Sequence, residues 1–212
     1  MPRIVLIYTA CAVLCCALHS AAHAATLSPE QTVAAVQEAL DKADEARLDE
    51  LMDVNGVIGQ GADIFLERAR TPEGQADLPP FLAMTLSSIE SSPQGRLIAR
   101  GLLQKAAEEF VRFGVRSGSF GGKGRETPKS KNMWSALFEG ASLGRKEIQQ
   151  VGKAVPEGGG VYVPCIVFDH GSQRVYIVEA ALTKNASGVW RITAIRNMND
   201  LMDQVRQESR AL

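Results

Sequence analysis

The stretch VYVPCIVFDHGSQRVYIVEAALTKNASGVWRITAIRN, residues 161–197, decides the fold. It contains three apolar runs, at 161–169, 173–184 and 189–197, separated by short turns rich in glycine, serine and asparagine. Runs of this length that are rich in valine and isoleucine are typical of strands, and such short turns join antiparallel neighbours. With a further run at 148–155, the pattern predicts a curved antiparallel meander of about four strands.

The run 161–168 is apolar on both alternating faces, which favours a strand that is covered on both sides. Pro164 interrupts this run and has no backbone N–H to donate to a ladder. We therefore expect a bulge or bend at Pro164 that curls the sheet.

Helical patterns precede the strands. Ser28-Pro29-Glu30-Gln31 has the form of an N-cap, a first-turn proline and a capping box. Further helices are expected from Asp44 to a C-cap at Asn55-Gly56, over 57–69, over 81–89 and from Ser92 to about Val115, with a closing helix over 199–209. Helices followed by strands predict an α+β fold, with a helical part at about 28–140 packed on a sheet part at about 145–212.

Residues 1–24 have the three parts of a secretory signal peptide: the basic start Met1-Pro2-Arg3, an apolar run at 4–18 and the small-residue end Ala22-His23-Ala24. We expect cleavage after Ala24, a periplasmic or secreted location and a single domain over 25–212. The whole chain carries 23 basic and 24 acidic residues, so its net charge gives no case for nucleic-acid binding.

Beyond the expected signal peptide, the chain has one cysteine, Cys165, and one histidine, His170. We expect a buried structural cysteine and a solvated turn histidine that point apart. Together they supply too few ligands for a zinc or copper site, so no metal is predicted. The glycine-rich stretch at 118–124 matches neither the P-loop nor the dinucleotide-binding spacing, and no cofactor is predicted.

Glu179 is a charged residue within a predicted strand whose neighbouring residues are apolar. On a covered face its carboxylate would be desolvated and could act as a general acid or base. The alternative is that Val175, Ile177, Glu179 and Thr183 form the more exposed face of the strand, where a charged side chain is ordinary.

Charge is segregated along the chain: residues 25–60 carry a net charge of −6 and residues 92–131 a net charge of +6. One interpretation is that helices of opposite charge pack as neighbours. The other is a basic face for anionic lipid or an acidic envelope protein, formed by Arg100, Lys105, Arg112, Arg116, Lys123 and the loop lysines Lys129 and Lys131.

The last strand, Gly188-Val189-Trp190-Arg191-Ile192-Thr193-Ala194-Ile195, resembles the closing strand of exported members of the nuclear transport factor 2-like (cystatin-like) superfamily. The spacing of Leu40, Asp44, Leu48 and Leu51 is also similar to the opening helices of such domains. The order of elements is similar to that of the MlaC family of periplasmic phospholipid carriers. Enzymatic members of the superfamily use Asp and Tyr side chains in the space between the curved sheet and the helices. The candidates here would be Glu179 or Tyr176, but their spacing in the sequence does not match that of the enzymes.

From these observations we expect a non-catalytic binding protein that holds an apolar ligand or lipid between its helices and its sheet. The lining of this groove is predicted to include Phe110, Phe113, Ile166, Phe168 and Tyr176, which as an alternative are ordinary core residues. The two competing functions are a small isomerase-like or hydrolase-like enzyme that uses Glu179, and an interaction module that docks through its basic face.

Overall fold

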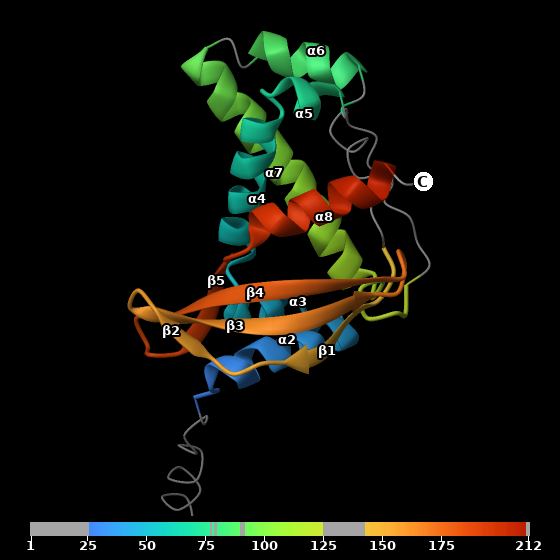
Figure 1. Ribbon diagram of the computed structural model, residues 1–212. Helices are drawn as coiled ribbons and strands as arrows, with labels where there is room; N and C mark the ends of the chain where they lie inside the picture. Colours follow the sequence, from blue (N-terminus) through green and yellow to red (C-terminus); the bar gives the residue numbers. More distant parts are fainter. Residues whose placement is uncertain (1–25, 77, 79, 90–91, 125–142, 211–212) are drawn as a thin grey trace, which may run out of the picture.

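The computed structural model describes residues 26–76, 78, 80–89, 92–124 and 143–210 (Figure 1). These residues confirm the α+β fold class, with helices first, an antiparallel sheet next and one helix at the end. The helices are α2 (Pro29–Lys42), α3 (Glu45–Leu51), α4 (Val54–Arg68), α5 (Pro72–Ala76), α6 (Pro80–Ile89), α7 (Pro93–Arg116) and α8 (Met198–Arg210). The strands are β1 (Lys146–Val151), β2 (Val155–Glu157), β3 (Gly160–Asp169), β4 (Arg174–Lys184) and β5 (Trp190–Ile195). The predicted signal peptide and the loop lysines Lys129 and Lys131 lie outside the described residues.

The sheet has the strand order β1-β3-β4-β5, and β2 pairs with β3 as well. Every pairing between these strands is antiparallel. The hairpin of β3 and β4 is paired from Val161 with Leu182 to Asp169 with Arg174. The prediction of one strand over 148–155 was wrong, because the chain leaves the ladder after β1 and rejoins it as β2.

Pro164 lies opposite the gap between β1 and β2. Its carbonyl accepts a 2.7 Å hydrogen bond from the backbone N–H of Gly152, and it pairs in regular register with Glu179. Proline is tolerated here because the missing N–H falls where the ladder is interrupted. The bulge that we expected at Pro164 is therefore absent from β3, and a register shift lies in β1 instead, between Ile148 and Gln150.

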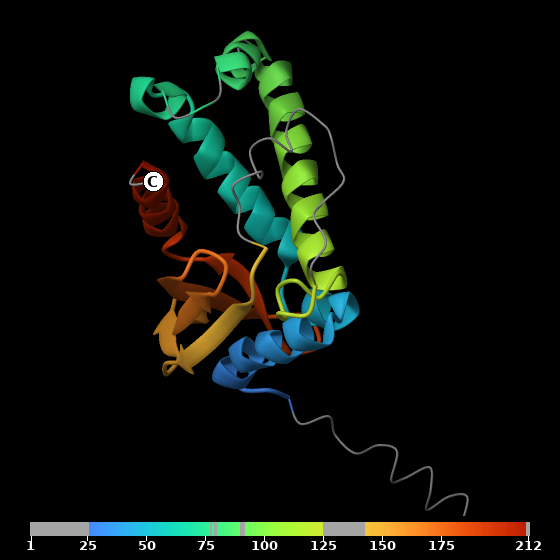
Figure 2. The same cartoon turned by 90° about the vertical axis from the view of Figure 1, so that its right-hand side faces the viewer.

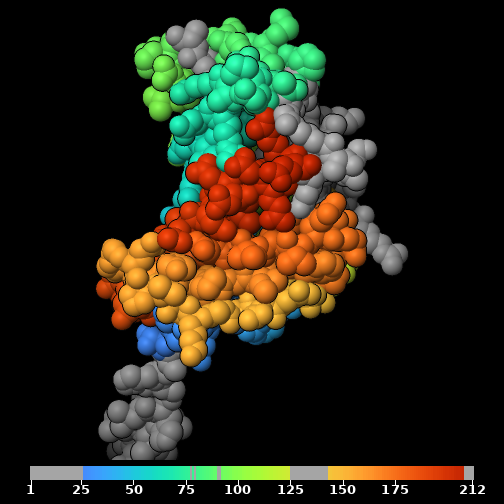
Figure 3. Space-filling view, in the orientation of Figure 1, coloured from blue at the N-terminus to red at the C-terminus, as the bar shows by residue number. Residues whose placement is uncertain are grey.

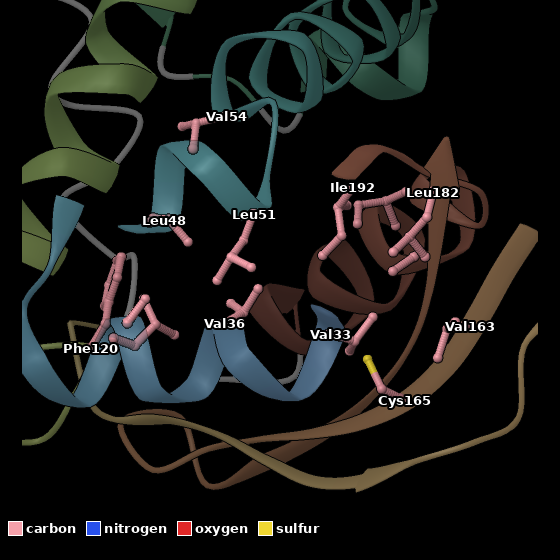
Figure 4. Close-up of a cluster of buried hydrophobic side chains, with 14 of the residues drawn as sticks. Val33, Val36, Leu48, Leu51, Val54, Phe120, Val163, Cys165, Leu182 and Ile192 are labelled. Carbon is pink, nitrogen blue, oxygen red and sulfur yellow. The ribbon is translucent and has the colours of Figure 1, made fainter. Parts of the chain in front are cut away.

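One face of the sheet is covered by α2 and α3, as Figure 2 shows. Alternate side chains of the strands point from this face into the main core, and the figure of the core shows them meeting the inner sides of both helices (Figure 4). Full burial stabilises each side chain of this size by about 1.5–3 kcal/mol. Members of this core include Val33, Val36, Leu48, Leu51, Val163, Leu182 and Ile192.

The opposite face of the sheet carries no helix within the described residues, and it faces the viewer in Figure 3. Directly paired residues share a face of a sheet, so Ile166 lies beside Ile177, and Phe168 lies beside Val175. Val175 is 48% exposed and Ile177 is 61% exposed. Within the described residues, helices therefore cover one face of β3, and on the other face Ile166 and Phe168 are half-buried.

The helices α4 and α7 lie side by side and extend away from the sheet as an arm, with α6 across its far end (Figures 1 and 2). The arm has a small core of its own, separate from the main one. On the outside of α6, Phe81 is 48% exposed and Met84 is 75% exposed. The buried residues of this second core are Ala62, Leu66, Ala69, Leu82, Leu86, Ala99, Leu103 and Ala106.

Short-range capping explains where the helices begin. The predicted capping box at Ser28 is formed, and Ser92 caps α7 by accepting a hydrogen bond from Gly95. The predicted C-cap at Asn55-Gly56 was wrong. Asp53 instead starts α4 by accepting a 3.2 Å hydrogen bond from the backbone N–H of Gly56, so the break between α3 and α4 falls three residues earlier.

The first half of β4 has a free edge, because β5 pairs only with its second half. Side-chain amides from the residue before α8 and from α8 itself cover this edge. Asn197 donates from Nδ2 to the carbonyl of Ile177 at 2.8 Å, and Gln204 donates from Nε2 to the carbonyl of Val175 at 2.9 Å. These bonds hold α8 along the edge of the sheet, next to the base of the arm.

Candidate functional site

The five residues predicted to line a groove do not come together. Ile166 and Phe168 lie on the open face of the sheet, whereas Tyr176 lies on the face that the helices cover. Phe110 packs against the main core, and Phe113 is half-buried on the same helix. The strands β3 and β4 themselves separate the two groups, so these residues do not form the wall of one groove.

Glu179 lies on the open face of the sheet and is paired with Arg196. Arg196 Nη1 donates to Glu179 Oε2 at 2.6 Å, and its Nε donates to Glu157 Oε1 at 3.0 Å. The guanidinium also lies 4.5 Å from the ring centre of Tyr162. The hydrogen bonds to Glu179 and then Glu157 raise the pKa of Arg196. The Arg196 side chain is 43% exposed, so this is an ion-pair network at the surface, with Glu179 engaged by Arg196.

Arg112 sits at the centre of an ion-pair network between α7 and α3. Its Nε donates to Glu108 at 2.8 Å, and its Nη1 donates to Asp49 at 3.1 Å and lies 3.7 Å from Glu45. The bonds to Glu108 and Asp49 raise the pKa of Arg112. A residue predicted for a basic docking face thus joins two helices of opposite charge.

The rest of the predicted basic face behaves in a similar way. Three of its residues contact acidic side chains or the backbone of α2. Arg100 bonds Asp63 at 2.5 and 3.0 Å, Arg116 lies 3.4 Å from Glu45, and Lys123 donates to the carbonyl of Asp41 at 2.6 Å. Arg116, Lys123 and Lys105 are exposed. Among the described residues, Arg112 supports the interpretation that helices of opposite charge pack as neighbours, and docking through the basic face stays a prediction.

Cys165 and His170 have no catalytic arrangement. Cys165 is buried in the main core, and burial raises the pKa of its thiol to about 11. The thiol is therefore neutral and a poor nucleophile at neutral pH. His170 Nε2 lies 2.6 Å from Glu147 Oε2 in the turn after β3. Within the described ranges, no group of three histidine, cysteine or acidic side chains is placed to hold a metal ion.

An interior ion pair lies at the end of β1 and β3. Lys146 Nζ is 2.8 Å from Asp169 and 5.5 Å from the ring centre of Phe120. The side chain of Asp169 is 8% exposed. Burial lowers the pKa of Lys146, and the contact with Asp169 opposes that shift. The pair satisfies a buried carboxylate at the end of the sheet.

An apolar cavity of about 430 Å³ lies between the arm and α8. Figure 3 shows α8 lying against α4 above the edge of the sheet. The volume falls in the range of about 300–1,000 Å³ that is usual for small-molecule pockets. The cavity is lined by Phe65, Arg68, Ala69, Gly74, Leu78, Met198, Leu201, Met202, Val205 and Arg206.

The position of α8 beside the cavity is held by Arg68 of α4. Its guanidinium donates to both carboxylate oxygens of Asp203, at 2.7 and 3.0 Å, and to the backbone carbonyl of Asn199 at 2.9 Å. These contacts and the amide bonds of α8 to β4 attach the helix at its polar side. Its apolar side, which carries Met202 and Val205, is left facing the cavity.

The sequence contained part of the signal for this site. The apolar positions Leu201, Met202 and Val205 are recognisable as one face of the closing helix, and we expected that face to pack on the sheet. Leu201 does pack against the main core, together with Met198, whereas Met202 and Val205 line the cavity opposite α4. Phe65 and Leu78 had no signal that distinguished a cavity wall from an ordinary core.

A second groove, of about 530 Å³, lies between α4 and α7 on the arm. Its wall is mainly charged and includes Asp63, Glu67, Arg70, Arg96 and Arg100. Because Arg100 already holds Asp63 with two hydrogen bonds, much of this charge is internally balanced.

No protein-family model, curated protein or solved structure matches this chain. In the part of the chain that the structure describes, no helix has both the length and the apolar character needed to cross a membrane.

Proposed function

We propose that this chain is an exported, non-catalytic binding protein that holds an apolar ligand in the cavity between α4, α5 and α8. The observation that carries the proposal is the cavity itself: of the ten lining residues that the structure describes, eight are apolar, and its volume is about 430 Å³. A ligand that covers an apolar wall removes it from water, and this burial favours binding by about 25 cal/mol for each Å² of apolar surface.

The nature of the wall supports a binding role. Met198 and Met202 are flexible and polarizable, and methionine adapts to ligands of different shape. The lining residues within the described part of the chain include no acid–base pair and no nucleophile. The cavity replaces the groove that we expected between α7 and the sheet. The export signal and the resemblance to the nuclear transport factor 2-like superfamily stay predictions, and both are compatible with a ligand carrier.

The test is binding of an uncharged apolar fluorophore, 1-N-phenylnaphthylamine, to detergent-free protein. Met202→Trp places a large side chain on the cavity wall, and Met84→Trp makes the same change on the exposed surface of α6. We expect saturable binding at one site, weakened about tenfold or more by Met202→Trp and unchanged by Met84→Trp.

Circular dichroism and thermal unfolding would establish that both variants are folded. Val205→Trp is a second filling variant from the next turn of α8, in case Met202→Trp destabilises the protein. Equal binding by the parent protein and all variants would show that the fluorophore binds elsewhere. Extraction of the purified parent protein into organic solvent, followed by mass spectrometry, would identify a ligand that is retained through purification.

A further inference from the structure

The exposed apolar side chains of this protein are concentrated at the far end of the arm. Among the described residues, nine large apolar side chains are exposed, and five of these belong to α6 or to the first half of α7. Figures 1 and 2 place both elements at the end of the arm that is farthest from the sheet. Exposed apolar groups that gather in one region mark an interaction site, whereas scattered ones are ordinary. This apolar tip consists of Phe81, Met84, Leu97, Ile98 and Leu102.

The helix α6 carries apolar side chains on both of its sides. Leu82 and Leu86 are buried in the small core of the arm, and Phe81 and Met84 are exposed on the outer side. No residue of α6 is charged. The outer side of a surface helix normally carries charged and polar residues that favour contact with water. The composition of α6 therefore favours an outer side that is covered by something less polar than water.

The outer side of α7 changes from apolar to charged along the helix. Four exposed residues, spaced by four, three and four positions, share one face. In order from the far end of the arm they are Ile98, Leu102, Lys105 and Glu109. At about 1.5 Å per residue, the apolar section from Leu97 to Leu102 extends for about 7.5 Å along the helix. This length matches the depth of about 5–10 Å to which interfacial segments enter the boundary of a bilayer.

The charge that follows the apolar section is positive. The first four turns of α7 contain three basic residues and no acidic one. Arg100 is paired with Asp63, whereas Arg96 and Lys105 are exposed and make no side-chain hydrogen bond or ion pair with the described residues. On and just after α4, the lining of the neighbouring groove adds two acidic side chains and one basic one, so a net positive charge remains.

We propose that the apolar tip is a docking surface for anionic lipid bilayers, with Phe81, Met84 and Ile98 in the acyl boundary and Arg96 and Lys105 at the phosphate groups. Long basic side chains reach head groups while their stems stay against apolar surface, and each one adds to the attraction of an anionic bilayer. A bilayer also explains the order along the arm, because it presents hydrocarbon, then anionic head groups, then water. This inference goes beyond the proposed function, since it does not involve the cavity.

The experiment is co-sedimentation of the protein with two kinds of vesicle over a salt series. One kind is phosphatidylcholine alone, and the other is an equal mixture of phosphatidylcholine and phosphatidylglycerol. We expect the protein to bind the mixed vesicles about tenfold or more better at low salt, and salt to weaken that binding. Met84→Trp reports insertion, because its fluorescence should be quenched by lipid that is brominated on the acyl chain. Ile177→Trp, on the open face of the sheet, should not be quenched.

A matched pair of variants tests the apolar residues. Ile98 and Ile177 are similarly exposed, at 57% and 61%, and only Ile98 belongs to the tip. Ile98→Glu is expected to weaken binding to the mixed vesicles about tenfold or more, because it places a carboxylate in the acyl boundary. Ile177→Glu makes the same change in net charge and is expected to leave binding nearly unchanged. Circular dichroism and thermal unfolding establish that both variants are folded.

A second matched pair tests the basic residues. The double variant Arg96→Gln with Lys105→Gln is expected to remove most of the preference for mixed vesicles. The double variant Lys153→Gln with Arg174→Gln removes the same charge from exposed positions outside the arm and should keep that preference.

Three results would overturn the proposal. They are equal binding to both kinds of vesicle or none to either, equal loss of binding in Ile98→Glu and Ile177→Glu, and a dimer in light scattering that Ile98→Glu converts to a monomer. The last result would identify a second copy of this chain as the occupant of the tip. The fluorophore test of the cavity contains no vesicles, so the two proposals fail or stand independently.

Discussion

Arg68 and Asp203 are 135 positions apart in the chain and are joined by two hydrogen bonds, of 2.7 and 3.0 Å. The first residue belongs to the arm and the second to the last helix, so the pair connects two elements that meet at the cavity. The Arg68 side chain is 26% exposed and that of Asp203 is 51% exposed. A bidentate pair of this kind positions α8 more than it stabilises the whole fold.

Asp203→Asn removes the charge and one acceptor while it keeps the shape of the side chain. We expect the free energy of unfolding to fall by about 0.5–1 kcal/mol, because the pair is partly exposed to solvent. Amide hydrogen exchange in α8 should become several-fold faster, since the helix loses its attachment to α4. Mass spectrometry of peptides from 198–210 measures this. The matched control is Asp200→Asn, an exposed position on the same helix. Equal exchange in the two variants would argue against the role of Arg68 in holding α8.

Two glycines of α7 should respond in opposite directions to the same substitution. A Cβ atom on Gly114 would collide with the ring of Phe120, whereas one on Gly101 would meet open space. Gly114→Ala is therefore expected to destabilise the protein by about 1–3 kcal/mol through overpacking. Gly101→Ala is expected to stabilise it by about 0.5–1 kcal/mol, because alanine loses less backbone entropy in a helix. Urea unfolding of the two variants beside the parent protein measures both values, and a shift of the same sign in both would contradict the packing of Phe120 on α7.

Arg112→Ala should be far more costly than Lys105→Ala, although both remove a cation from α7. Without Arg112, the carboxylates of Glu45, Asp49 and Glu108 lose their shared partner. We expect a loss of about 1–2 kcal/mol for this partly buried network. Lys105→Ala should change stability by less than about 0.5 kcal/mol, because the side chain is exposed. Chemical denaturation at low and high salt gives the comparison. Equal losses in the two variants would mean that Arg112 is not the centre of a stabilising network.

Local signals predicted much of the fold. The capping box at Ser28 and the Ser-Pro start at Ser92 act within one turn of a helix, so they are visible in sequence and are present in the structure. The apolar runs at 161–169 and 173–184, joined by a short turn, likewise predicted the hairpin of β3 and β4. Errors arose where two local signals competed. Asn55-Gly56 has the composition of a C-cap, yet the carboxylate of Asp53, two residues earlier, begins a new helix instead.

The candidate site was less predictable, because apolar composition does not say which surface an apolar face will meet. Ile166 and Tyr176 are both apolar or aromatic strand residues, and only the register of β3 against β4 places them on opposite faces. The apolar face of α8 was recognisable as a face, but its partner on α4 lies more than a hundred residues away in the chain.

By itself, the sequence determined the order and type of the elements, because capping, turn formation and alternation act between residues a few positions apart. It also determined that the chain carries acidic and basic helical segments. The tertiary structure decided which charges meet, as Arg112 does with Asp49 and Arg68 does with Asp203, and which apolar faces line a cavity rather than fill a core. These outcomes depend on contacts between distant segments, and a contact of that kind leaves no pattern within either segment alone.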